Sequence, residues 1–346
     1  MLMSVFSSGG IGIDLGSANA VVYLENQGVV LREPACALVN RDNSGDVIAL
    51  GREARRLLGR TGEDAIMVSP VSDGGVADQD LAAMLLLSAA EKASEKRRPF
   101  EKSRLAVSVP HGATRVERAA LASAIGLAGA KRAIMVKSGV AAALGAGVRI
   151  DRPQGVLVIS VGSSLTEISI LSMNGVVASR TMKAGSLAFD EAIVRYVRRV
   201  KGLVIGMSTA EDLKKDIGTA KKPENGAEVL LRGRHVVTGK PSTESVNASD
   251  VYLALNEPIR AIVESVCDAL YNVPPELTGD ILDSGIYLTG GGALLDGFAD
   301  RLKSETQLTV NVSAHPEDDT AIGVGRVACD DRLARALVNA FSAYEV

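Results

Sequence analysis

The chain alternates two patterns of apolar and polar positions along most of its length. Short apolar runs predict buried strands, and apolar residues repeated every three or four positions predict helices. This alternation is typical of an α/β protein. The expected strands are residues 11–15, 20–24, 105–109, 133–136, 156–161, 167–171 and 286–288, and the expected helices are residues 81–95, 116–127, 139–146, 189–200 and 210–217.

One pattern occurs twice. The segment IDLGS at 13–17 precedes an apolar strand that ends near NQGVV at 26–30. The segment ISVGS at 159–163 precedes an apolar strand that ends at MNGVV at 173–177. Both patterns indicate a β-hairpin with a loop of small residues. The repeated hairpin predicts two related halves that face each other.

Composition and charge narrow the class of protein. A chain of 346 residues fits more than one domain, and with 3% aromatic residues its cores must be mainly aliphatic. The formal net charge of −3 gives no electrostatic reason to expect a nucleic-acid partner. No apolar run approaches the roughly 18 residues of a spanning helix. Widely spaced Cys36, Cys267 and Cys329 indicate reduced thiols in a cytoplasmic protein, and the three separate histidines give no transition-metal spacing.

Three loops of small residues could hold phosphate. Small side chains leave backbone N–H groups unobstructed, and concave clusters of N–H groups bind anions. A hairpin turn explains any one such loop, but three in this order along an α/β chain are a much more specific sign of phosphate binding. The candidate residues are Gly16, Ser17, Ala18 and Asn19 in the first loop, Gly162, Ser163 and Ser164 in the second, and Gly290, Gly291, Gly292, Ala293 and Leu294 in the third.

The loops belong to a longer series of motifs. The series is GIDLGSAN at 12–19, DGGVAD at 73–78, VP at 109–110 followed by VER at 116–118, AAALGAG at 141–147, FDEAI at 189–193, TAE at 209–211, VTG at 237–239, PPEL at 274–277 and LTGGGALL at 288–295. In this order the chain resembles the MreB-type bacterial actin homologues of the actin, sugar-kinase and heat-shock-chaperone superfamily. The resemblance implies an actin-like (ribonuclease H-like) α/β fold of two duplicated lobes flanking a nucleotide cleft. It implies subdomain IA at 1–32, 76–147 and 316–346, IB at 33–75, IIA at 148–182 and 248–315, and IIB at 183–247.

The resemblance also implies ligands and partners. ATP or ADP would bind in the cleft, with Asp14 holding Mg²⁺ through water. Glu211 and Lys214, one helical turn apart, would touch the adenosine end of the nucleotide. The subunits would stack into protofilaments, in antiparallel pairs at the inner face of the membrane. An active MreB and membrane-anchored cell-shape proteins are the further partners that the resemblance suggests.

Two departures from the family motifs affect hydrolysis. The family's second phosphate loop reads DIGGGTTE, whereas this chain has SVGSSLTE at 160–167, so Ser160 replaces an aspartate that helps to hold Mg²⁺. Before the alanine-rich helix, Ser138 replaces the glutamate that orients the attacking water. Mg²⁺ prefers anionic oxygens and serine is a poor general base, so we expect weakened metal binding and impaired hydrolysis. Compensation by Glu167 or Asp190 stays open.

Membrane contact is expected at two segments. Leu2, Met3, Val5 and Phe6 form an apolar N-terminal segment, and Phe100 follows a basic cluster at Lys96, Arg97 and Arg98. The leading interpretation is a cytoskeletal filament subunit in the cytoplasm, peripheral at the inner membrane. Two alternatives remain, namely an active ATPase or sugar kinase on the same superfold and a regulator of MreB that does not polymerise.

Overall fold

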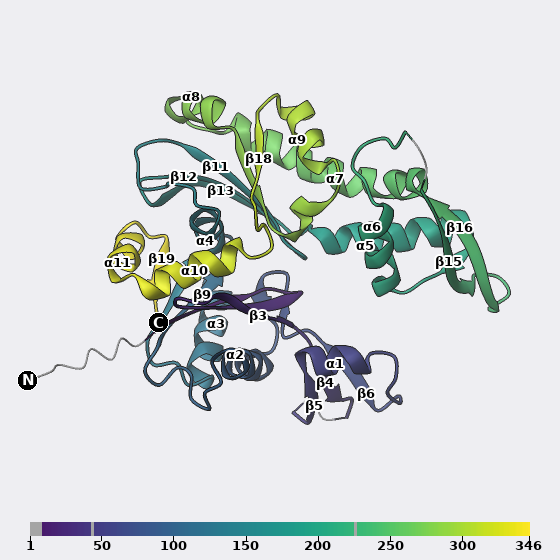
Figure 1. Cartoon of the computed structure of the whole chain (residues 1–346), viewed down its shortest axis with the longest axis horizontal. Coiled ribbons are helices and arrows are strands. Elements are labelled where there is room, and N and C mark those ends of the chain that lie inside the picture. Colours follow the sequence, from purple (N-terminus) through teal and green to yellow (C-terminus); the bar gives the residue numbers. More distant parts are fainter. Residues whose placement is uncertain (1–8, 43–44, 225–226) are drawn as a thin grey trace, which may run out of the picture.

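Two central sheets, one in each lobe, organise the chain (Figure 1). The computed structural model describes residues 9–42, 45–224 and 227–346. The first sheet has the order β19-β10-β9-β1-β2-β3, and the second has the order β13-β12-β11-β17-β18. Their strands are β1 Gly10–Leu15, β2 Asn19–Leu24, β3 Gly28–Pro34, β9 Arg104–Val109, β10 Ala133–Lys137 and β19 Ala343–Glu345, then β11 Val156–Val161, β12 Thr166–Ser172, β13 Gly175–Met182, β17 Ile286–Thr289 and β18 Val310–Val312.

The two sheets share one topology. In each, a first strand (β1 or β11) pairs antiparallel with the second, the second pairs antiparallel with the third, and the first pairs parallel with a later strand. The hairpin loops also close alike, because Gly16 N–H donates to the Asn19 carbonyl at 3.0 Å and Gly162 N–H donates to the Leu165 carbonyl at 2.8 Å. The predicted duplication of the hairpin is therefore confirmed.

Two helices lie between the sheets and join the lobes (Figure 1). These are α4 Ser138–Gly145 and α10 Asp319–Cys329. Their backbones approach so closely that a Cβ atom at Gly145 would overlap the Asp319 carbonyl, and one at Gly323 would overlap the Ala141 carbonyl. The core between the sheets combines residues of β9 and β10, both helices, and β11. A side chain at either glycine would therefore force the lobes apart.

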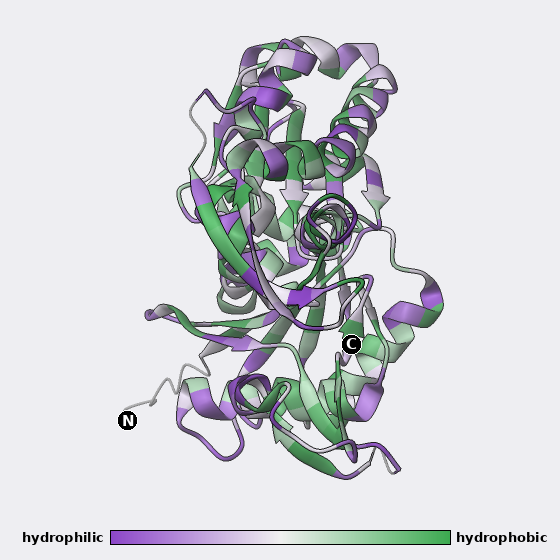
Figure 2. Ribbon diagram, turned by 90° about the vertical axis from the view of Figure 1, so that its right-hand side faces the viewer, coloured by the Kyte–Doolittle hydropathy of each residue, from purple (hydrophilic) through white to green (hydrophobic). Residues whose placement is uncertain are grey.

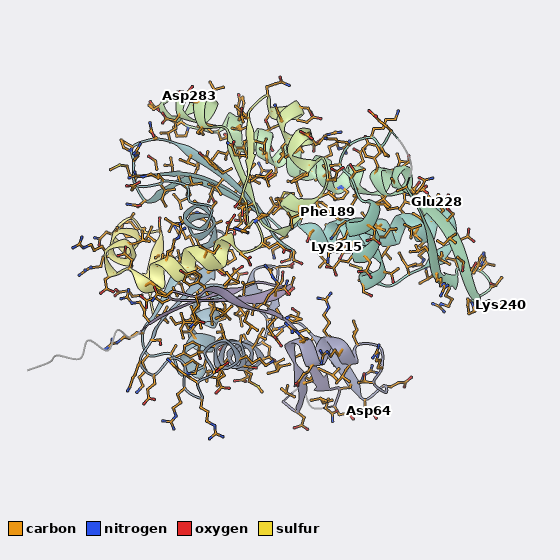
Figure 3. All side chains as sticks on the ribbon, viewed as in Figure 1. Asp64, Phe189, Lys215, Glu228, Lys240 and Asp283 are labelled. Carbon is orange, nitrogen blue, oxygen red and sulfur yellow. The ribbon has the colours of Figure 1, made fainter. Side chains whose placement is uncertain are left out.

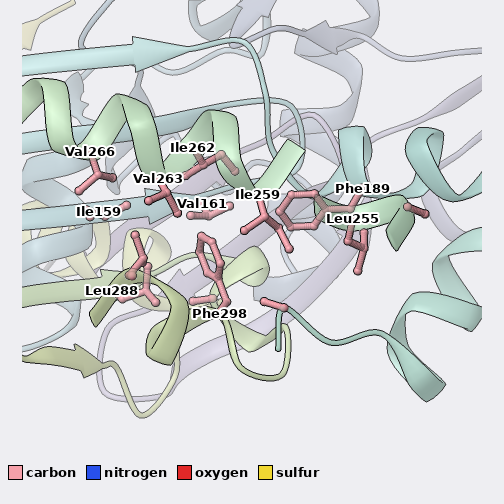
Figure 4. Close-up of a cluster of buried hydrophobic side chains, with 14 of the residues drawn as sticks. Ile159, Val161, Phe189, Leu255, Ile259, Ile262, Val263, Val266, Leu288 and Phe298 are labelled. Atoms are coloured by element: carbon pink, nitrogen blue, oxygen red, sulfur yellow. The ribbon is translucent and has the colours of Figure 1, made fainter. Parts of the chain in front are cut away.

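Several of the remaining helices cover the outer faces of the sheets. In the first lobe α2 and α3 pack on the sheet, and in the second α7 packs along it, with Ile259, Val263 and Phe298 in the core (Figure 4). Figure 2 shows apolar segments gathered on the inner strands. The helices are α2 Gln79–Ser94, α3 Arg115–Leu127, α5 Ser186–Tyr196 continued by a π-helical turn Val197–Lys201, α6 Met207–Ile217, α7 Ala248–Tyr271, α8 Pro275–Ser284, α9 Phe298–Thr306 and α11 Asp331–Asn339.

Each lobe carries a small outer sheet. Asp64 in Figure 3 marks the end beside the first, and Glu228 and Lys240 mark the second. Glu33 anchors the first small sheet, since its buried carboxylate accepts from the Arg52 N–H at 2.8 Å and pairs with Lys92 at 2.9 Å. The small sheets are β4 Ala37–Asn40, β5 Val47–Leu50 and β6 Ala65–Val68 with helix α1 Gly51–Leu57, and β14 Leu203–Val204, β15 Glu228–His235 and β16 Pro241–Asn247; a separate ribbon pairs β7 Val71–Ser72 with β8 Gly75–Val76.

Every strand and helix expected from the hydropathy pattern is present, with ends shifted by a few residues. Phe100 is a correction. Its side chain is 3% exposed and packs in the first lobe's core, so the expectation that it contacts lipid is wrong for this structure. A Phe beside a basic run suggests a surface tip, but here its ring completes the core. The other expected lipid contacts, Leu2, Met3, Val5 and Phe6, lie outside the described residues.

Candidate functional site

The two hairpin loops meet where the lobes face each other. The Ser17 Oγ and Ser164 Oγ atoms lie 2.8 Å apart and share a hydrogen bond between the lobes. In the described part of the chain, the backbone N–H groups of Ser17, Ala18, Ser163 and Ser164 donate no hydrogen bond. Opposed clusters of free N–H groups are suited to an anion such as a phosphate chain.

Helix α5 fixes the direction of the second loop. Its first N–H groups, from Ser186 and Leu187, donate to the carbonyls of Gly162 and Ser163, each at 2.9 Å. A Cβ atom at Gly185 would lie 2.5 Å from both of these carbonyl oxygens. The loop carbonyls therefore turn back toward the helix, which leaves the loop N–H groups free. This orientation does not need glycine at 163 and 164, so the serines there do not abolish the phosphate cradle.

The third loop is only partly available to a ligand. Gly290 has φ +83°, and its N–H donates to the Pro316 carbonyl at 2.9 Å. Gly292 and Ala293 are buried, with Gly292 packed against Val161, whereas Gly291 and Leu294 are exposed. The segment Gly291–Leu294 forms a 3₁₀ turn. Of the five candidate residues, Gly292 and Ala293 therefore serve packing, whereas Gly290, Gly291 and Leu294 are at least partly exposed to solvent.

The floor of the site holds one carboxylate where the family motif has two. Asp14 and Ser160 occupy equivalent positions, each two residues before its loop glycine and partly exposed. Ser108 donates to Asp14 at 2.5 Å. Burial raises the pKa of Asp14 above its ordinary value, while the Ser108 hydrogen bond and the Arg32 charge act in the opposite direction. The free N–H groups of the two hairpin loops suit a nucleotide phosphate, whereas Mg²⁺ would find a single anionic protein group there, the Asp14 carboxylate.

A buried carboxylate, that of Glu167, lies next to Ser138. The Ser138 hydroxyl donates to Glu167 Oε2 and also lies 3.2 Å from the Val109 carbonyl, and the His111 N–H donates to Glu167 Oε1 at 2.8 Å. Glu167 is 6% exposed. Burial raises its pKa, the two hydrogen bonds lower it, and the nearby charge of Asp14 raises it again, with a net upward direction.

The expected adenosine-contacting pair on α6 is engaged in ion pairs. Glu211 pairs with Lys215 at 2.7 Å and with Arg55 at 3.2 Å. Arg55 lies in α1 beside the small sheet of the other lobe, so this ion pair joins the two lobes. Lys214 pairs with buried Asp190 at 2.8 Å and donates to the Ser186 carbonyl at 3.2 Å. The two side chains thus point to different partners, and Lys214 also braces the helix that orients the second loop.

A pocket of about 450 Å³ opens between the lobes beside Glu167's partner His111. Asp73 and Lys183 approach to 3.9 Å across it. Its other lining residues are Gly74, Pro110, Gly112, Ala113, Glu117, Leu165, Ser179 and Thr181. Among residues 9–42, 45–224 and 227–346, no group of three or more His, Cys, Asp or Glu side chains could hold a metal ion. Within the same ranges, no helix has both the length and the hydropathy needed to span a bilayer.

The paired sheets, the helices between them and the three glycine-containing loops define an actin-like α/β fold. The crystal structure of MreB 5 of Spiroplasma citri bound to AMPPNP matches with a TM-score of 0.89 and 32% identity, covering 96% of this chain and 99% of that one. The MamK double helical filament shares the fold, with a TM-score of 0.76 and 20% identity over 92% of this chain and 98% of that one.

Sequence comparison gives the family. The MreB/Mbl protein family model matches residues 8–335. The cell shape-determining protein Mbl of Bacillus subtilis (strain 168) is 38% identical over 315 residues, which are 91% of this chain and 94% of that protein. The chain belongs to the MreB/Mbl family. The resemblance inferred from the motifs is confirmed.

The structure adds residues that sequence patterns did not single out. Ser108 holds Asp14, His111 holds Glu167 through its backbone, and Arg55 reaches Glu211. The first two lie beside the family-like Val109-Pro110 stretch, which was a usable signal. Arg55 lies in a helix with no motif, and only the folded arrangement of the lobes places it there.

Proposed function

We propose that this chain is a filament subunit that binds ATP or ADP between its lobes and assembles for a role in cell shape or intracellular organisation. The observation that carries the proposal is the pair of opposed loops with free N–H groups, joined through Ser17 and Ser164. Family membership supports assembly, and the AMPPNP bound by the Spiroplasma protein supports the choice of ligand. Membership in the MreB/Mbl family favours this function over the sugar-kinase alternative.

Hydrolysis is impaired under this proposal. Phosphoryl transfer depends on charge neutralisation by a metal ion and on a positioned nucleophile. Ser160 supplies no anionic oxygen opposite Asp14, and Ser138 cannot act alone as a base near neutral pH. Mg²⁺ binding is weakened for the same reason. The nucleotide cycle would therefore stay mainly in the ATP state, and the filaments would disassemble slowly.

A sedimentation experiment tests binding, assembly and hydrolysis together. The purified protein is incubated with ATP and Mg²⁺ and pelleted, and the nucleotide in the pellet is identified. Intact ATP in the pellet supports the proposal. Absence of both pellet and bound nucleotide contradicts it, and stoichiometric ADP contradicts impaired hydrolysis.

A restored variant gives the matched comparison. The double change Ser138→Glu and Ser160→Asp returns both missing carboxylates, and we expect ADP to replace ATP in its pellet. A double variant that assembles but still retains ATP would show that the two serines are not the cause.

Membrane association and the division into four subdomains are further parts of the proposal. With Phe100 buried, the exposed basic cluster at Lys96, Arg97 and Arg98 is the candidate contact, at about 1 kcal/mol per charge near an anionic surface. Co-sedimentation with anionic vesicles should exceed that with neutral vesicles. Changing the three cations to glutamate should remove the difference, and equal binding by this variant would refute the contact.

A further inference from the structure

Glu167 links the two lobes at the position where the family's water-orienting glutamate is missing. It projects from β12 in the second lobe and bonds to Ser138 and to the His111 N–H in the first. We propose that Glu167, acting through the Ser138 hydroxyl, positions the attacking water and takes up its proton in the slow ATP hydrolysis left to this chain. This inference rests on the proposed function, because it presupposes that ATP binds between the lobes.

The hydrogen bonds orient the pair for this task. A serine hydroxyl has one proton and two acceptor lone pairs. Because the Ser138 proton is directed at Glu167, the lone pairs of its oxygen remain available to accept from a water molecule. The His111 N–H fixes the other carboxylate oxygen, so the carboxylate cannot rotate away. Glu167 does not touch the water itself and is a positioning residue in this arrangement.

The other buried carboxylates of the described chain, and partly exposed Asp14, are engaged elsewhere. Glu33 pairs with Lys92 and Asp250 pairs with Lys201. Asp190 forms an ion pair with Lys214 at 2.8 Å. Asp319 accepts from Thr289 at 2.5 Å. Asp14 accepts from Ser108 and is the group available to a hydrated cation. Among these groups only Glu167 bonds to Ser138.

The step balances without a further reactant. The water oxygen forms a bond to the γ-phosphorus of ATP, and the bond from that phosphorus to the bridging oxygen of ADP breaks. Ser138 Oγ accepts one proton from the water and passes its own proton to Glu167. The products are ADP, inorganic phosphate and a protonated Glu167, which later releases its proton to solvent. A positioned acid–base group typically contributes about 10²–10⁴ in rate, and a relay through a hydroxyl should fall at the low end.

The test uses single-turnover phosphate release from the full chain with ATP and Mg²⁺. Glu167→Gln keeps an oxygen that can accept from His111 but removes the base, and Ser138→Ala removes the relay. We expect each to slow release at least about tenfold, and the double variant to be no slower than either single one. Ser172→Ala, at the far end of β12, is the control and should release phosphate at the unaltered rate.

A second set of measurements separates positioning from a structural role. The affinity for AMPPNP and the urea midpoint without nucleotide should stay close to those of the unaltered protein in Glu167→Gln. Adding Ser138→Glu to Glu167→Gln should restore release, because the carboxylate then contacts the water directly. Rescue would not occur if Glu167 only held the lobes together.

Three results would overturn the inference. They are unchanged phosphate release in Glu167→Gln, additive losses in the double variant, and no phosphate release at any time from ATP-loaded wild-type filaments. The last result would leave binding and assembly standing. Failure of the wild-type protein to bind nucleotide or form filaments would instead refute the proposed function.

Discussion

Replacing Gly290 by alanine should damage the third loop far more than the same change one residue later. Gly290 has φ +83° and ψ 158°, a region that is essentially restricted to glycine, and holding another residue there costs about 1–3 kcal/mol. Its new Cβ atom would lie 2.4 Å from the Val161 carbonyl oxygen, and such overpacking costs about 1–3 kcal/mol more. Together these give a loss of about 2–6 kcal/mol, a large fraction of a typical folding free energy.

Gly291→Ala is the matched control, because its Cβ atom would meet only the Glu317 side chain, at 3.5 Å from Oε1 and 3.8 Å from Cγ, and its φ is not positive. We expect it to leave stability unchanged or to raise it by up to about 1 kcal/mol. The assay is urea unfolding followed by circular dichroism, with the affinity for AMPPNP measured in parallel. Gly290→Ala should lower both the midpoint and the affinity. Equal midpoints for the two variants would refute the steric reasoning.

Three further substitutions test other contacts. Glu33→Gln should cost about 1.5–3 kcal/mol. Burial alone would raise the pKa of Glu33, but the Arg52 N–H and Lys92 lower it below the ordinary 4.5. The stabilisation by Glu33 is therefore present above pH 4.5 and is lost as the pH falls through the folded-state pKa. Urea midpoints measured at several pH values should show this loss in the unaltered protein and not in Glu33→Gln. Arg55→Ala breaks the half-exposed ion pair with Glu211, and such a pair contributes about 0–1 kcal/mol. The rate of release of a fluorescent ATP analogue should therefore rise less than about fivefold. The increase should appear only at low salt, because salt screens an exposed ion pair. Lys214→Met leaves Asp190 buried without its cation and should cost about 3–5 kcal/mol, and most of this loss should be recovered by adding Asp190→Leu; no recovery in the urea midpoint would contradict the ion-pair account.

The sequence predicted the parts of this protein that depend on local pattern. Strand and helix positions follow from periodicity, and the duplicated hairpins follow from the repeated glycine loops, because a tight turn between apolar strands needs little tertiary context. Burial within a loop was harder to predict. Phe100 and Gly292 resemble surface residues in their sequence context, but both are buried by segments distant in the chain.

Contacts between the lobes could not be predicted in the same way. The partnership of Ser138 with Glu167 joins a helix start to a strand 29 residues away, and that of Arg55 with Glu211 spans 156 residues. Side chains on separate lobes meet only because α4 and α10 hold the sheets at one spacing. The family motifs indicated which loops form the site, but they gave no pairing for residues where this chain departs from the motif.

The departures from the motif have a common physical result. Ser164 replaces a glycine and shares a neutral hydrogen bond with Ser17 of the opposite lobe. Ser138 replaces a glutamate and donates a charge-assisted hydrogen bond to Glu167 of the opposite lobe. A typical hydrogen bond contributes about 0.5–1.5 kcal/mol net, and one to a charged group about 1.5–3 kcal/mol. A site with a glutamate at position 138 would place a second carboxylate beside Glu167, and that repulsion would need a cation or a bound proton to offset it. With serine at position 138, the hydroxyl bonds directly to Glu167 of the opposite lobe, and no cation or added proton is needed. Ser138, one of the two changes proposed to impair hydrolysis, therefore also adds a bond between the lobes, as Ser164 does. A bond of this kind would suit the proposed subunit that holds its nucleotide in a long-lived filament.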